Sequence, residues 1–164
     1  MARTQRQVSK ENAQRMEITI VLDTNILLNA KNADEQYSAY SLQILDAIED
    51  GSMQGVISVI SMAELYTGYY TKGDKKGKEE LHAHLISTKG FVIVDLDLGI
   101  SDAAARIRAD TGLRLPDAVI IATGLAKGSQ YVVTHDKELK KASRYLETIS
   151  SKELLGRLRH VKKK

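Results

Sequence analysis

The sequence predicts an α/β fold, a three-layer α/β/α sandwich with a mostly parallel central sheet. Short apolar runs that are typical of strands alternate along the chain with segments whose apolar residues recur at helical intervals. The strand runs are apolar without clean alternation, which indicates that crossover helices bury both faces of the sheet. With 164 residues and 43% hydrophobic content, one domain around one core is the default expectation.

The elements follow one another in a βα order. The strand candidates are the short apolar runs at 18–22, 55–60, 91–95 and 131–134, with a weaker one at 145–149. The helix candidates are the segments of helical period at 35–50, 61–71, 77–88, 98–111, 116–127, 136–142 and 150–158. Glycine follows three of these helices, at Gly51, Gly112 and Gly128, as is common at helix C-termini.

The composition limits the chemistry that this chain can perform. It contains no cysteine, which excludes disulfides, thiolate zinc sites and thiol nucleophiles and leaves oxygen and imidazole as metal ligands. Hard cations are therefore the natural candidates. The start of the chain has no apolar segment and no later apolar run could cross a bilayer, so we expect a cytoplasmic protein without a membrane role.

Charge divides the chain into three parts. Residues 1–15 are a basic N-terminal extension with a formal net charge of +3, and residues 157–164 are a basic C-terminal tail with +5. The domain between them, residues 16–156, carries −5. Basic ends on an acidic body suit a polyanionic partner, with Arg3 and Arg6 as possible contacts. Ordinary solubilising ends would give the same pattern.

Four carboxylates are placed where a parallel sheet binds its ligands. Asp23 directly follows the first strand, Glu64 lies in the first turn of the helix after the second strand, and Asp136 lies two residues beyond the fourth. Asp117 follows Pro116 in the first turn of another helix. Ligands of open parallel sheets bind outside the carboxyl ends of the strands, so we expect these acids to share one edge.

Each of these acids also has an ordinary structural explanation. Ser61 and Glu64 have the spacing of a capping box, and Asp117 is a favourable acid in the first turn of a helix. Asp136 suits a helix cap and Asp23 an ordinary turn. Capping does not require that the caps coincide in space, so a common location of the four would favour a functional site.

A shared location would call for a cation. Four carboxylates close together repel one another and raise their own pKa values unless a cation neutralises them. Mg²⁺ or Mn²⁺ suits an all-oxygen site that retains water ligands. Such a site supports hydrolysis of a phosphodiester by a metal-activated water. Thr24, Asn25 and Thr134 could orient the water or the scissile phosphate. Asp95 and Asp97, which also end a strand, are rivals for a place in the cluster, and Asp97 suits a helix cap.

Four sequence pieces surround the acids, which are separated by 41, 53 and 19 residues. The pieces are Val-Leu-Asp23-Thr24-Asn25, Ser58-Val-Ile-Ser61-Met-Ala-Glu64-Leu65, Leu115-Pro116-Asp117-Ala118 leading to Ile-Ile-Ala-Thr-Gly, and Val-Val-Thr134-His135-Asp136-Lys-Glu-Leu139. In their order and spacing they resemble PIN-domain nucleases, and within these the VapC toxins of VapBC toxin-antitoxin pairs. The resemblance covers nearly all of residues 16–150.

The resemblance implies a PIN-like fold, dependence on Mg²⁺ or Mn²⁺, endonucleolytic cleavage of RNA, an antitoxin protein as partner and a homodimer. It assigns Asp23, Glu64, Asp117 and Asp136 to the family's acidic positions, which makes them the catalytic and metal-binding residues. Asp23, Asp117 and Asp136 are expected to be direct ligands, whereas Glu64 is the acid most easily reassigned to capping or to a contact through water.

Two features depart from the most compact members of that family. They are the N-terminal extension and a lysine-rich loop near residues 72–78, in which Lys72, Lys75 and Lys76 could contact RNA. A solvated loop would have the same composition. The alternatives to a toxin are an RNA-processing or DNA-acting nuclease of the same fold, or a catalytically inactive scaffold that binds RNA or protein.

Overall fold

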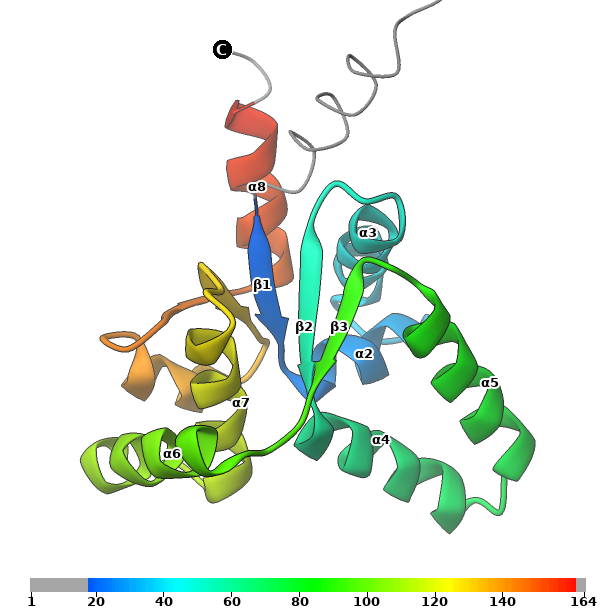
Figure 1. The fold of residues 1–164 in the computed structure, drawn as a ribbon. Helices are drawn as coiled ribbons and strands as arrows, with labels where there is room; N and C mark the ends of the chain where they lie inside the picture. Colours follow the sequence, from blue (N-terminus) through cyan, green and yellow to red (C-terminus); the bar gives the residue numbers. More distant parts are fainter. Residues whose placement is uncertain (1–17, 162–164) are drawn as a thin grey trace, which may run out of the picture.

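A computed structural model of the chain describes residues 18–161. Its centre is one sheet of five strands in the order β3-β2-β1-β4-β5 (Figure 1). The strands are β1 (Thr19–Leu22), β2 (Gln54–Ser58), β3 (Phe91–Val94), β4 (Tyr131–Val133) and β5 (Glu147–Ile149). All neighbouring strands pair in parallel. The predicted parallel sheet is therefore confirmed, and the weak fifth strand is real.

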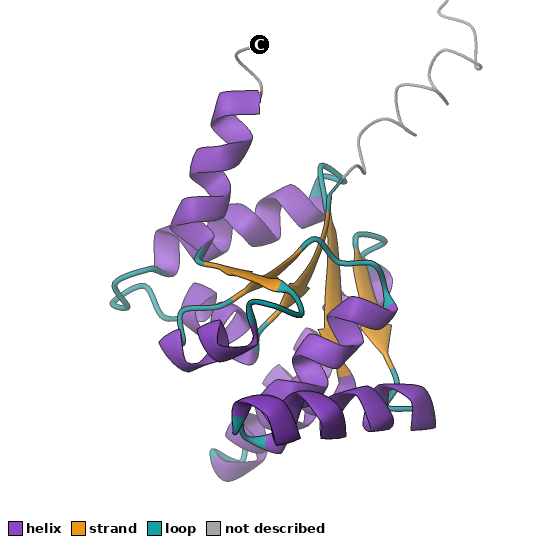
Figure 2. Ribbon diagram, turned by 90° about the vertical axis from the view of Figure 1, so that its left-hand side faces the viewer, coloured by secondary structure: helices purple, strands orange, loops and turns teal. Residues whose placement is uncertain are grey.

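Helices cover both faces of this sheet. They are α2 (Thr24–Lys31), α3 (Ser38–Glu49), α4 (Val59–Thr71), α5 (Lys75–Ser87), α6 (Leu98–Thr111), α7 (Leu115–Ala126), the 3₁₀ helix η1 (Lys137–Ala142) and α8 (Ser151–Val161). Figure 2 shows the strands in orange between two groups of purple helices. This arrangement is the three-layer α/β/α sandwich that the sequence predicts.

The side chains of the strands point alternately into two apolar cores. On β1, Ile20 and Leu22 pack with residues of α2, α3, α4, α5 and α8, whereas Val21 packs with residues of α6, α7 and η1. All three side chains are fully buried. Because each face is apolar, the strands read as continuous hydrophobic runs instead of alternating ones.

Several predicted boundaries are corrected by the structure. Residues 24–31 form a helix, α2, where the sequence suggested only a turn after Asp23. The second strand ends at Ser58 and α4 begins at once, so the predicted strand end and helix start are each displaced by two residues. The predicted lysine loop is mostly helix, because α5 begins at Lys75. The predicted C-terminal helix extends into the basic tail, as far as Val161.

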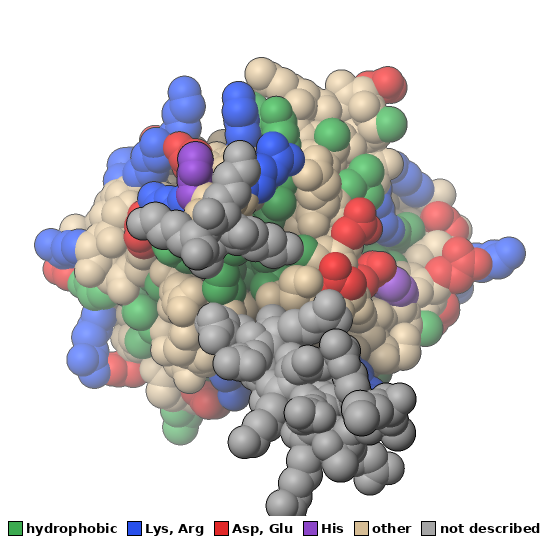
Figure 3. Space-filling view, turned by 90° about the horizontal axis from the view of Figure 1, so that it is seen from above, with side chains coloured by type: hydrophobic (Ala, Val, Ile, Leu, Met, Phe, Trp, Pro, Cys, Tyr) green, Lys and Arg blue, Asp and Glu red, His purple; other side chains and the backbone are tan. Residues whose placement is uncertain are grey.

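The topology creates a switch point between β1 and β4. The chain leaves β1 towards β2 and β3 on one side and then returns to place β4 on the other side of β1. At the carboxyl ends of these two strands, the Asp23 N–H donates to the carbonyl oxygen of Val133 at 3.0 Å. Ligands of open α/β sheets bind at such points. Figure 3 shows the other end of the molecule, seen from the amino ends of the strands, where acidic and basic side chains are scattered.

Among residues 18–161, no helix is both long enough and apolar enough to cross a membrane.

Candidate active site at the carboxyl edge of the sheet

One cavity at the switch point collects all four predicted acids. It has a volume of about 450 Å³ and is lined by Asp23, Thr24, Asn25, Leu28, Glu64, Thr67, Arg114, Asp117 and Asp136. These residues come from the ends of β1 and β4 and from α2, α4 and α7. The four carboxylates therefore share a location that helix capping does not require.

Asp23 is the most constrained of the acids. Its side chain is 6% exposed and accepts hydrogen bonds from the Thr134 hydroxyl at 2.6 Å and the Asn25 amide at 3.0 Å. Although Asp23 occupies the N-cap of α2, its side chain makes no capping bond. Burial raises its pKa to about 6, opposed by the Thr134 hydrogen bond and reinforced by the negative charges of Asp117 and Glu64.

Glu64 is not a helix cap. The N-cap of α4 is Ser58, whose hydroxyl accepts from the N–H of Ile60 at 3.2 Å, and Ser61 is buried inside the helix. The capping-box explanation is thus wrong, because the N-cap is Ser58, three residues before Ser61. The Glu64 carboxylate instead accepts a hydrogen bond from the Thr24 hydroxyl. Glu64 lies in the second turn of α4, where an acid has no capping role, so its position beside Asp23 has to be explained otherwise.

Asp117 is held by an arginine that the sequence reading did not single out. It lies on the first turn of α7 and is 5% exposed. Arg114, the N-cap residue of α7, donates to its carboxylate from Nε at 3.0 Å and from Nη2 at 3.4 Å. The sequence did contain a signal for this pair. Arg114 and Asp117 are three residues apart at a helix start, and residues at i and i+3 lie on the same helix face. Arg114 also lines the cavity, where its charge opposes those of the acids.

Asp136 combines two roles. Its carboxylate caps η1 by accepting from the N–H of Glu138 at 2.9 Å, as the capping explanation predicted. It also lines the acidic cavity. The Thr134 hydroxyl accepts from the Asp136 N–H at 2.9 Å while it donates to Asp23. One threonine thus sets the position of two acids.

Asn25 completes this arrangement. Its amide donates to Asp23 and, at 3.3 Å, to the Thr134 hydroxyl, and its carbonyl oxygen accepts from the N–H of His135 at 3.3 Å. Asn25 therefore ties the start of α2 to the segment that follows β4. Thr24, Asn25 and Thr134, predicted as orienting groups, all contact an acid of the site.

The donor set fits a hard cation, but the carboxylates are engaged elsewhere. All the ionisable groups that line the cavity, apart from Arg114, are carboxylates, which suits Mg²⁺ or Mn²⁺. Within residues 18–161, no three Asp, Glu or His side chains stand close enough to hold a metal as a group. The reason is local: Arg114 holds Asp117, Thr24 holds Glu64, and the η1 backbone holds Asp136. A cation would have to draw these side chains together.

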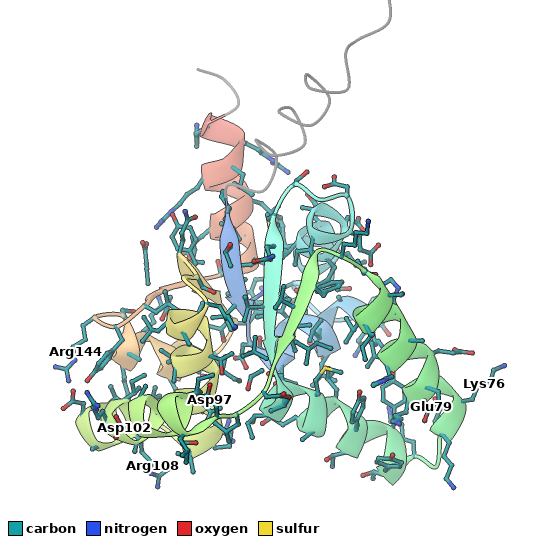
Figure 4. The ribbon with its side chains drawn as sticks, in the orientation of Figure 1. Lys76, Glu79, Asp97, Asp102, Arg108 and Arg144 are labelled. Atoms are coloured by element: carbon teal, nitrogen blue, oxygen red, sulfur yellow. The ribbon has the colours of Figure 1, made fainter. Side chains whose placement is uncertain are left out.

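The other predicted residues lie apart from this cavity. Asp97, labelled in Figure 4, caps α6 by accepting from the N–H of Ile100 at 2.8 Å. It is not among the residues that line the acidic cavity. Lys72 lines a neighbouring cavity, while Lys75 and Lys76 lie on the first turn of α5, where Lys76 pairs with Glu80 at 3.8 Å. The predicted contacts Arg3 and Arg6 lie outside the described residues.

A family model and solved structures are similar to this chain. The model described as PIN domain matches residues 20–145. FitAcB from Neisseria gonorrhoeae is 24% identical with a TM-score of 0.62, over 80% of this chain and 97% of that one. VapBC2 from Rickettsia felis, bound to a DNA fragment from its promoter, is 19% identical with a TM-score of 0.64, over 81% and 98%.

A third structure is named for its activity. VapC20 of Mycobacterium tuberculosis, described as a toxin that cleaves the sarcin-ricin loop, is 15% identical with a TM-score of 0.62, over 78% of this chain and 97% of that one. At these identities the structures establish a shared fold. No curated protein matches the sequence.

Proposed function

The chain belongs to the PIN domain family, a family of nucleases, and from this premise we propose that it is a Mg²⁺- or Mn²⁺-dependent endoribonuclease. The observation that carries the proposal is the acidic cavity, in which Asp23 is buried beside Asp117 and Glu64 and has a pKa raised to about 6. Such crowding of carboxylates is unfavourable for the chain alone and becomes favourable when a cation enters.

The residues that would hold the cation are Asp23, Asp117 and Asp136, with Glu64 as a ligand or as the acceptor of a metal-bound water. A bound cation would polarise the phosphodiester and lower the pKa of a water that attacks it. The chain supplies the positioning. Thr134 and Asn25 fix one carboxylate oxygen of Asp23, and Thr24 fixes Glu64.

We propose RNA as the substrate and a toxin role within a VapBC-type pair. Support comes from structures with the same fold whose names describe toxin-antitoxin complexes, among them one from Klebsiella pneumoniae at 21% identity and a TM-score of 0.60. VapC20, named as a toxin that cleaves the sarcin-ricin loop, also supports it. An antitoxin protein would then be the natural partner. A homodimer is part of the same proposal.

Cleavage of a circular single-stranded RNA by the purified full-length chain tests the enzymatic part. A circle has no ends, so its linearisation requires an endonuclease. We expect cutting with Mn²⁺ or Mg²⁺ and none with EDTA. We also expect Asp23→Asn and Asp117→Asn to slow cutting by at least about 100-fold, because each removes a ligand charge from the site.

The matched control is Asp102→Asn, which removes the charge of an exposed aspartate on α6 that pairs with Arg106. It should cut as fast as the wild type. A wild type that leaves RNA circles intact with every metal, or site variants that cut as fast as the control, would overturn the proposed chemistry. Faster cutting of a DNA circle than of an RNA circle would overturn RNA as the substrate.

The toxin role is tested by growth. Expression of the wild type should arrest growth, expression of Asp23→Asn should not, and the gene beside it should encode a small protein that restores growth. Normal growth with active enzyme would contradict the toxin role and leave a nuclease without it.

A further inference from the structure

A second cavity adjoins the acidic one. It has a volume of about 590 Å³ and is lined by Gln36, Tyr37, Thr134, His135, Asp136, Lys137, Lys140, Thr148, Ile149, Ser150, Lys152 and Glu153. Asp136 lines both cavities, so a strand whose phosphate lies at the acids can continue into the second cavity without leaving the surface. The lining of this cavity comes from the segment before α3, from the residues after β4 and the 3₁₀ helix η1, and from β5 and the start of α8.

The cationic groups of this cavity are available to a ligand. Within residues 18–161, neither Lys137 nor Lys140 forms an ion pair, and both are exposed. Lys152 lies over the ring of Tyr40, with Nζ 5.9 Å from the ring centroid. These three ammonium groups, supplied by η1 and by the start of α8, border one opening.

The acidic groups of the same cavity are already engaged. Glu153 and Ser150 form a reciprocal cap of α8, in which the Ser150 N–H donates to Glu153 at 2.9 Å and the Glu153 N–H donates to the Ser150 hydroxyl at 3.2 Å. The Ser150 backbone hydrogen bond holds the pKa of Glu153 below its ordinary value, and the charge of Lys140 contributes. Asp136 caps η1. Within the described residues, neither acid forms an ion pair with Lys137 or Lys140, although Lys140 is near enough to act on Glu153.

An aromatic pair lines the second cavity. The rings of Tyr37 and His135 are 4.8 Å apart at their centroids and tilted by 38°. His135 is held in place by a 2.7 Å contact between its Nε2 and the Ser151 hydroxyl. A fixed ring beside phosphate-binding cations is the combination with which proteins bind single-stranded nucleic acid, because bases stack on the ring while cations follow the backbone.

We propose that this cavity, defined by Tyr37, His135, Lys137, Lys140 and Lys152, is a subsite for single-stranded RNA. It holds the nucleotides beyond the scissile phosphate, with one base on the Tyr37 ring and the adjacent phosphates on Lys137 and Lys140. The inference rests on the proposed nuclease function. It adds a recognition site to that function. None of these residues takes part in the chemistry; they determine how long an RNA strand the protein binds.

The test measures binding of a short fluorescent oligoribonucleotide by anisotropy, in the uncleaving Asp23→Asn background. Replacing both Lys137 and Lys140 with alanine should weaken binding about tenfold and reduce the salt slope of log K by about 1.4, the value expected when two contacts to a single-stranded phosphate backbone are lost. The matched control is Lys141→Ala. Lys141 lies on the same 3₁₀ helix, pairs with Glu138 and does not line the cavity. Its salt slope should stay unchanged.

The ring is tested separately. Tyr37→Ala should weaken binding about tenfold, within the range measured for loss of a stacked base, whereas Tyr37→Phe should bind as the parent does. The subsite proposal is overturned if the double lysine variant has the same salt slope of RNA binding as Lys141→Ala. It is also overturned if neither the parent nor any variant binds RNA. The same variants are also titrated with poly-glutamate. If the lysine replacements weaken binding of poly-glutamate and leave RNA binding unchanged, the cavity is assigned to an acidic protein instead.

The failure of the two proposals can be told apart. If RNA binds with a lysine-dependent salt slope but the wild type never cuts it, the subsite stands and the nuclease fails. If the wild type cuts RNA and the lysines have no effect on binding, the nuclease stands and the subsite fails.

Discussion

The ionised carboxylate of Asp23 lowers the stability of the fold at neutral pH. Its folded-state pKa is raised from 3.8 to about 6, so between these values the folded state binds a proton that the unfolded state has lost. Stability therefore falls as pH rises through this window and levels off above it, by about 3 kcal/mol in total. Asp23→Asn cannot ionise and keeps the acceptor for Thr134. We expect the inactive variant to be more stable than the wild type above pH 6, and the advantage to disappear near pH 4.

Urea unfolding across this pH range, with EDTA present, measures the effect. Asp102→Asn is the control, because that side chain is exposed and its loss should change stability little at any pH. An Asp23→Asn variant whose stability follows the wild type in parallel at every pH would show that Asp23 does not titrate near 6.

Arg114 competes with a cation for Asp117. Its guanidinium makes two hydrogen bonds to that carboxylate, so a metal that binds Asp117 has to displace or share them. We expect Arg114→Ala to tighten Mn²⁺ binding about three- to tenfold, a modest effect because the arginine is largely exposed. The rise of the melting temperature with Mn²⁺ concentration reports the affinity without any need for activity.

Arg106→Ala is the matched control for Arg114→Ala, since Arg106 forms an Arg–Asp pair on α6 away from the cavity. It should leave Mn²⁺ binding as in the wild type. Weaker Mn²⁺ binding in Arg114→Ala would mean that the arginine supports the metal site instead of competing with it.

Among the residues of the site, the sequence predicted which acids come together but not what holds them. Asp23, Glu64, Asp117 and Asp136 were found because the ends of parallel strands meet at one edge. Their partners were harder to predict, because a hydrogen bond such as Thr134 to Asp23 joins residues 111 positions apart. Metal ligation by these acids stays a prediction.

At the scale of elements, the misplaced boundaries have local causes. The helix α2 begins directly after β1, and its eight residues follow Asp23, which was read as part of a turn. Strand β2 and α4 are joined without a loop, so one apolar run, residues 55–60, contains the end of a strand and the start of a helix. Apolar periodicity cannot separate a buried strand from a buried helix over so few residues.

The packing of α7 against β1 depends on a glycine. A Cβ at Gly124 would lie 2.5 Å from Cγ1 of Val21 and 2.9 Å from Cδ2 of Leu146. Since both side chains are buried, we expect Gly124→Ala to destabilise the fold by about 1–3 kcal/mol, although alanine favours helix. The same change should reduce activity, because α7 carries Asp117. Urea unfolding and the cleavage assay measure the two effects.

The control for Gly124→Ala is Gly156→Ala in α8, where a Cβ would meet nothing within 4 Å. That substitution should stabilise the protein by about 0.5–1 kcal/mol, the usual gain from replacing a helical glycine. A stabilising effect at both positions would show that α7 can move away from β1 at little cost.

At the scale of the whole molecule, fold class and layer order followed from the sequence because each strand is apolar on both faces. The distribution of charge was equally readable, with −5 on residues 16–156 and +3 on residues 1–15. The tail boundary at 157 divides α8, in which Arg157 pairs with Glu147 at 2.8 Å. The boundary was placed where the charge changes, but the helix continues past that point. Charge composition alone does not show where a helix ends.

Deleting residues 1–15 should weaken RNA binding and flatten its salt dependence, because four basic side chains leave the chain. The slope should fall by up to about 2.8 if all four contact phosphates. Anisotropy titrations at several salt concentrations, in the Asp23→Asn background, measure it. Replacing the same Arg and Lys residues with glutamine should reproduce the effect at full length. An unchanged slope would leave this extension without a role in RNA binding.

The position of β4 in the sheet has a consequence for synthesis. β4 pairs with β1, yet it is the fourth strand along the described residues, and Thr134 and Asp136 follow it. A nascent chain that has emerged only as far as α7 therefore has Asp23 without the hydroxyl of Thr134, and it lacks Asp136. If the finished protein is a ribonuclease, the ribosome that makes it is not exposed to an assembled site until almost the whole domain has been translated.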